Sequence, residues 1–72
     1  MGRTDIKTAW VHCYRDGALL RSYDFGVPLP VDASAFQWPS RESLEAEAKT
    51  NLTTERLAFP PYEGIRFEIE HE

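Results

Sequence analysis

The 72-residue chain contains little cysteine, histidine or glycine, and each shortage excludes a class of protein. The single cysteine, Cys13, excludes an intramolecular disulfide framework. With only two histidines in addition, the chain lacks the ligands of a Cys/His structural zinc site. Gly17, Gly26 and Gly64 are isolated from one another, so the sequence contains no phosphate-binding glycine loop.

Long hydrophobic runs and an excess of basic charge are also missing. No apolar stretch approaches the ~20 residues of a membrane-spanning helix, and the N-terminus lacks the apolar region of a signal peptide, so we expect a cytoplasmic protein. Eight basic and twelve acidic residues give a net charge of −4, which argues against a broad surface for a nucleic-acid backbone. A chain this short buries a small core, which favours stabilisation by a partner or by a second copy in a homodimer.

The first half of the chain predicts a β-hairpin over residues 7–25. Its two arms are rich in aromatic and β-branched residues, and Asp16-Gly17 between them is a strong signal for a two-residue turn. Such a turn places Trp10 opposite Tyr23, whereas a three-residue loop with a bulge would shift the pairing.

This register predicts one aromatic face, made of Trp10, Tyr14, Tyr23 and Phe25. The face has two interpretations. It packs against the helix as part of the core, or it is a surface on which single-stranded bases stack. The core interpretation is favoured, because exposing four aromatic side chains is costly in a small fold.

The rest of the chain predicts an irregular apolar loop over 26–39, a helix over 41–55 and a strand over 65–70. Ser40 is a good helix N-cap. An apolar stripe at four-residue spacing follows it, made of Leu44, Ala48 and Leu52. We therefore expect residues 1–72 to form a single small α+β domain of order ββαβ, a three-stranded antiparallel sheet of strand order 2-1-3 with one helix on one face. This order resembles the topology of small antitoxin and phage-encoded inhibitor domains, and the resemblance implies no residue roles.

Catalytic chemistry has little support in the sequence. His12 and Cys13 are the one pair that suggests nucleophilic catalysis, but adjacent strand residues point to opposite faces and cannot form a dyad. Cys13 is therefore expected to be a small buried side chain. We expect no catalytic residue, no metal site and no cofactor.

The acidic second half of the chain is the feature that suggests a function. Residues 37–72 carry the whole net charge, and every acidic residue there is glutamate. An ordinary solvated surface is one interpretation. The functional hypothesis is a docking surface for a basic protein, which makes the chain a non-catalytic inhibitor or regulator of a nucleic-acid-binding enzyme or complex. The alternative is a single-stranded nucleic-acid-binding module that uses the aromatic face. The candidate docking residues are Glu42, Glu45, Glu55, Glu68 and Glu70.

Overall fold

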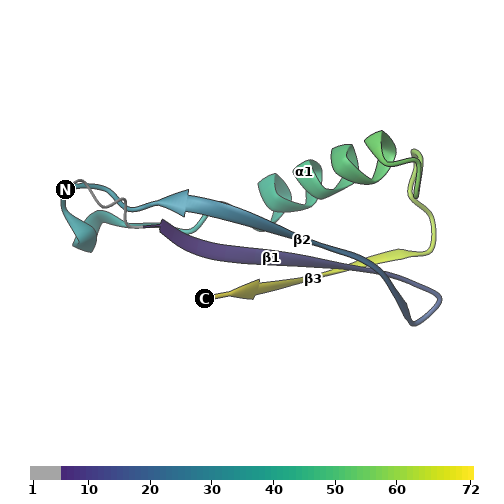
Figure 1. Cartoon of the computed structure of the whole chain (residues 1–72), viewed down its shortest axis with the longest axis horizontal. Coiled ribbons are helices and arrows are strands. Elements are labelled where there is room, and N and C mark those ends of the chain that lie inside the picture. The colour runs from purple at the N-terminus through teal and green to yellow at the C-terminus, as the bar shows by residue number, and fades with distance from the viewer. Residues whose placement is uncertain (1–5) are drawn as a thin grey trace.

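The computed structural model describes residues 6–72, which contain three strands and one α-helix in the order ββαβ (Figure 1). The sheet is antiparallel, with strand order β2-β1-β3. The α+β fold and the strand order predicted from the sequence are therefore confirmed. The elements are β1 (Ile6–Arg15), β2 (Ala18–Pro28), the short 3-10 helix η1 (Ala33–Ala35), α1 (Arg41–Thr54) and β3 (Ile65–His71).

The β1–β2 hairpin turns at the predicted dipeptide. Asp16 and Gly17 both have positive φ, at 54° and 81°, as a type I′ turn requires. Next to the turn, Tyr14 lies opposite Leu19 as predicted. One residue further along β2, Leu20 has no partner on β1, so the hairpin contains a β-bulge.

The bulge makes the predicted pairing wrong over the rest of the hairpin. Trp10 lies opposite Asp24 and not opposite Tyr23. Tyr23 and Phe25 consequently lie on the side of the sheet that carries α1, whereas Trp10 and Tyr14 lie on the other side. The four aromatic residues therefore do not share one face, and only two of them contribute to the core.

Burial of polar groups gives the physical reason for the shifted register. Without the bulge, Ser22 and Asp24 would lie on the same face as Ala9 and Val11, which are completely buried. A hydroxyl and a carboxylate buried there without partners would cost several kcal/mol (about 2–7 for the hydroxyl). The bulge moves both polar side chains to the other face, where both residues are exposed.

Helix α1 begins where the sequence predicts and buries the predicted stripe. The Ser40 side chain accepts a hydrogen bond from the Ser43 backbone N–H at 3.1 Å, which caps the helix. Leu44, Ala48 and Leu52 are at most 2% exposed. They pack over β1 and β3 against a set of small and aromatic side chains, Ala9, Val11, Cys13 and Phe67. We call this side of the sheet the helix-covered face.

The segment between β2 and α1 is anchored by aromatic contacts. Trp38 packs against the core and stacks on the His71 ring, with ring centroids 4.3 Å apart. Phe36 meets Trp38 edge to face at 5.0 Å. These contacts tie the predicted apolar loop to the end of β3 on the helix-covered face.

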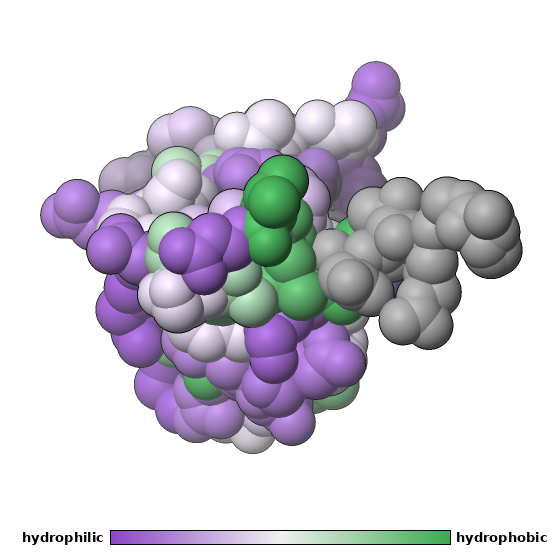
Figure 2. Space-filling model, turned by 90° about the vertical axis from the view of Figure 1, so that its left-hand side faces the viewer, coloured by the Kyte–Doolittle hydropathy of each residue, from purple (hydrophilic) through white to green (hydrophobic). Residues whose placement is uncertain are grey.

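The hairpin extends beyond the start of α1, which makes the molecule elongated (Figure 1). The radius of gyration is 14.1 Å, against about 11 Å for a compact chain of this length. Four large apolar residues of the described range are exposed, and two of them, Ile6 and Val31, lie at or near the ends of β1 and β2 away from the turn. Figure 2 views the molecule from the end opposite the hairpin turn and shows apolar surface there among hydrophilic residues. The part of the chain that the structure describes contains no helix both long and apolar enough to cross a membrane.

Candidate functional site

The side of the sheet opposite α1 carries most of the polar side chains that the strands contribute. We call it the open face. Its central row comes from β1, where Trp10, His12 and Tyr14 are each partly exposed. The flanking rows come from the strand partners of these residues. They consist of Leu19, Ser22 and Asp24 on β2 and of Arg66, Glu68 and Glu70 on β3.

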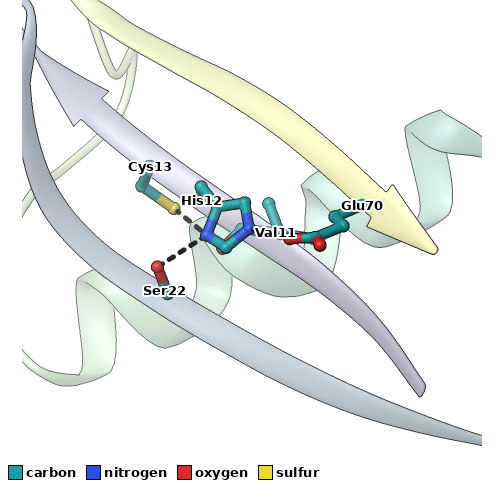
Figure 3. A network of polar contacts seen from close by, with 5 residues as sticks. All are labelled: Val11, His12, Cys13, Ser22 and Glu70. Carbon is teal, nitrogen blue, oxygen red and sulfur yellow. Dashed lines mark hydrogen bonds and ion pairs between the residues drawn. The ribbon is translucent and has the colours of Figure 1, made fainter. Parts of the chain in front are cut away.

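His12 links all three strands across the open face (Figure 3). Its Nε2 lies 2.9 Å from Glu70 Oε1, and its Nδ1 lies 2.7 Å from Ser22 Oγ. Because a carboxylate only accepts hydrogen bonds, Nε2–H donates to Glu70. In the neutral ring Nδ1 then accepts from the Ser22 hydroxyl, and every polar atom of the imidazole is satisfied.

This chain of contacts has the residue types of a Ser-His-acid triad, but its surroundings differ from those of a hydrolase site. Such a serine acts within a pocket that holds the substrate and stabilises the oxyanion. A cavity of about 370 Å³ lies between β2 and the start of α1, and neither Ser22, His12 nor Glu70 lines it. The two hydrogen bonds fix the orientation of the His12 ring between Ser22 and Glu70.

Tyr14 and Arg66 form a second cluster on the open face. The Arg66 guanidinium lies 4.7 Å from the centre of the Tyr14 ring, and it also forms an ion pair with Glu68. A cation over an aromatic face gains electrostatic attraction from the ring quadrupole. The open face thus already holds one guanidinium between an aromatic ring and a carboxylate.

The predicted acidic residues do not form one surface. Glu68 and Glu70 lie on the open face, while Glu42, Glu45 and Glu55 belong to α1 and its C-cap, on the other side of the sheet. Glu42 and Glu55 are themselves about 20 Å apart along the helix axis. The five candidates therefore divide into two strand residues, two glutamates in the first turns of α1 and one glutamate at its C-cap.

Two of the helix glutamates are engaged in contacts within the chain. Glu45 pairs with Arg41, with Arg41 Nε 2.6 Å from Glu45 Oε2. Glu55 pairs with Arg21, with Arg21 Nε 3.2 Å from Glu55 Oε1, and it accepts a hydrogen bond from the Tyr23 hydroxyl at 3.0 Å. Burial, followed by this hydrogen bond, raises the pKa of Tyr23 to about 12. Glu55 thus connects the end of α1 to β2.

Cys13 is completely buried on the helix-covered face, as the sequence predicts. Burial raises the pKa of its thiol to about 11, which disfavours the thiolate that a nucleophile or a metal ligand requires. Within residues 6–72, no group of three or more His, Cys, Asp and Glu side chains is placed to hold a metal ion.

The outer edge of β2 borders the cavity described above. Phe25, Val27 and Leu44 contribute apolar surface to it, and Asp24 and Glu47 also line it. A free strand edge beside an apolar cavity is a place where another strand can add to the sheet. The predicted homodimer, through a free sheet edge or through the apolar loop, stays a prediction.

Sequence reasoning missed two members of the open face, Ser22 and Asp24, because the face of each depends on the register of the hairpin. A comparison with protein-family models, with curated proteins and with solved structures gave no match. The site is therefore interpreted from its own geometry.

Proposed function

We propose that the open face binds a basic surface of another protein, and that the chain is a non-catalytic inhibitor or regulator of a nucleic-acid-binding enzyme. The observation that carries the proposal is the arrangement of Trp10 and Tyr14 in the central row, with three carboxylates beside them. Those carboxylates are Asp24, Glu68 and Glu70. A partner that binds nucleic acid presents a basic groove, which such a face complements.

Aromatic anchors distinguish the open face from the outer surface of α1. Tryptophan and tyrosine are enriched among the residues that dominate the energy of protein interfaces. The helix exposes Glu42 and Glu47, but its own sequence contains no aromatic residue. Carboxylates alone mainly raise the rate at which two proteins associate. Aromatic side chains that become buried in the interface also slow the dissociation of the complex. This difference favours the open face as the docking surface.

The alternative of single-stranded nucleic-acid binding has less support after the change of register. Tyr23 is 8% exposed and bonded to Glu55, and Phe25 lies on the helix-covered face with it. Only Trp10 and Tyr14 remain for base stacking. Asp24 and Glu70 lie directly beside Trp10 and would repel a phosphate backbone.

The proposal is tested with two charge-reversal variants of equal size. Glu68→Lys with Glu70→Lys reverses the open face, and Glu42→Lys with Glu47→Lys makes the same change on α1. Each chain is immobilised, incubated with lysate of the source cell at low salt, and the retained proteins are identified by mass spectrometry. We expect a protein with a basic surface to be retained by the wild type and by the helix variant, and to be lost by the open-face variant.

Measurements with the purified partner then give the size of the effect. The open-face variant should associate at least about tenfold more slowly at low salt, because long-range attraction sets the encounter rate. Circular dichroism should show both variants folded, since exposed charges contribute only ~0–1 kcal/mol each. Equal retention of that protein by all three chains would overturn the proposal, and stronger retention of single-stranded nucleic acid by the open-face variant would support the alternative.

A further inference from the structure

Trp10 lies at a point of the open face where acidic side chains stand on both sides. Asp24 of β2 and Glu70 of β3 are its direct cross-strand partners. Side chains directly opposite each other on antiparallel strands have Cβ atoms about 5 Å apart, so both carboxylates are within reach of a group on the indole. The indole is partly exposed and is the strongest cation-binding ring among the aromatic side chains.

The chain itself shows how a cation fits on this face. At the other end of the central row, Arg66 lies over Tyr14 and pairs with Glu68. Trp10 repeats the combination of ring and carboxylate, but its partner on β3 is Glu70, where Tyr14 has Arg66. The position that Arg66 takes beside Tyr14 is therefore occupied beside Trp10 by Glu70. Among residues 6–72, no arginine or lysine lies over the Trp10 ring, so this part of the open face can accept a cation from a partner.

We propose that Trp10, Asp24 and Glu70 form a binding site for an arginine side chain of the basic partner. This inference rests on the proposed function and specifies the group that the open face recognises. Arginine fits better than lysine, because its planar guanidinium stacks on an indole while its edge donates two parallel hydrogen bonds to a carboxylate. The arginine site would give specificity for a guanidinium group, and the other carboxylates of the open face would attract the basic partner.

His12 and Ser22 position one wall of this arginine site. The imidazole donates to Glu70 Oε1 and leaves Glu70 Oε2 for the incoming guanidinium. The hydrogen bond between the Ser22 hydroxyl and His12 Nδ1 holds the ring in that orientation. His12 is a positioning residue here, because it acts on the guanidinium only through Glu70.

The test uses the peptide acetyl-(Gly-Arg)4-amide as probe and follows the two indole N–H signals by NMR. The Trp10 signal should shift on titration, whereas the Trp38 signal, on the helix-covered face, should stay in place and serve as the internal control. The matched peptide acetyl-(Gly-citrulline)4-amide has the same shape without charge and should cause no shift. A shift that is equal for both indoles, or equal for both peptides, would overturn the arginine site.

Variants separate this inference from the proposed function. Trp10→Leu and Asp24→Asn should each weaken peptide binding by about fivefold to tenfold, and Tyr14→Leu should have a smaller effect. Asp24→Asn removes only a charge from an exposed residue and should leave the fold intact. It therefore tests the arginine site even where Trp10→Leu unfolds the chain. Loss of binding in the Glu68→Lys, Glu70→Lys variant with unchanged binding in Trp10→Leu and Asp24→Asn would overturn the arginine site and leave the proposed function standing. Unchanged peptide binding in all of these variants would overturn both the arginine site and the proposed function.

Discussion

The two faces of the sheet are built from alternate residues of the same strands, yet they depend on different interactions. On the helix-covered face, Val11 and Cys13 contact the apolar stripe of α1 and are fully buried. On the open face, Trp10 and His12 contact polar side chains of the neighbouring strands and remain partly exposed. Stability should therefore reside mainly in the first face and recognition in the second.

The largest effect that tests this division is expected from Leu52→Ala. Leu52 is 0% exposed and lies in the middle of the core. Its truncation should lower the free energy of unfolding by ~2–4 kcal/mol, because it removes apolar contacts and leaves a cavity. Urea unfolding followed by circular dichroism measures the change. A loss below about 0.5 kcal/mol would mean that the helix-covered face is not the main source of stability.

Alkaline pH should destabilise the helix-covered face through Cys13. Burial holds the thiol pKa at about 11 instead of 9.0, so the folded chain keeps a proton that the unfolded chain releases. The stability linked to this proton is fully present below pH 9.0 and is lost as the pH rises through about 11. The total loss should be on the order of 3 kcal/mol, of which about half should be present at pH 10.

Urea unfolding between pH 7 and pH 10 checks this expectation, with Cys13→Ala as the control. The variant should be less stable at neutral pH but should show a flatter profile above pH 9.0, where Cys13 begins to titrate in the unfolded chain. At higher pH the Tyr23 hydroxyl adds a loss of the same sign, since its pKa is raised from 10.0 to about 12. Parallel profiles for the two proteins would contradict the assignment to Cys13.

The smallest effect is expected on the open face, from Ser22→Ala. The substitution removes the exposed hydroxyl that donates to His12 and should cost at most ~0.5–1 kcal/mol of folding stability. Ser22→Thr retains the hydroxyl and is the matched control. Thermal unfolding of both variants compares them directly, and a loss above about 2 kcal/mol would show that the open face also stabilises the fold.

The elements of this fold are predictable because their signals are local. Asp16 and Gly17 readily adopt the two positive φ angles that the turn requires, and the Ser40 side chain caps α1. The alternation of Phe67 and Ile69 with glutamates indicates that the apolar side of the strand faces the core and its charged side faces water. Phe67 is indeed buried, and Glu68 and Glu70 are exposed. None of these predictions requires knowledge of a distant residue.

The register of the hairpin could not be obtained from local signals, because a bulge at an ordinary leucine leaves no mark in the sequence. A non-local signal was nevertheless present. Only a one-residue shift places Tyr23 and Phe25 with the small side chains of β1 and moves Ser22 and Asp24 to the polar face. The contact between His12 and Glu70 is diagonal across two strands, so it depends on side-chain direction as well as on register.

Because Leu20 is unpaired, the number of residues in β2 decides which face of the sheet its side chains lie on. Residues 18–19 and residues 21–28 of β2 alternate out of phase with each other, and a single residue separates the two phases. A deletion or insertion at this position would exchange the two faces of most of β2 without altering any other side chain. It would place Tyr23 in solvent and Asp24 under α1, so chains that keep this fold should keep the number of residues between the turn and Tyr23 constant.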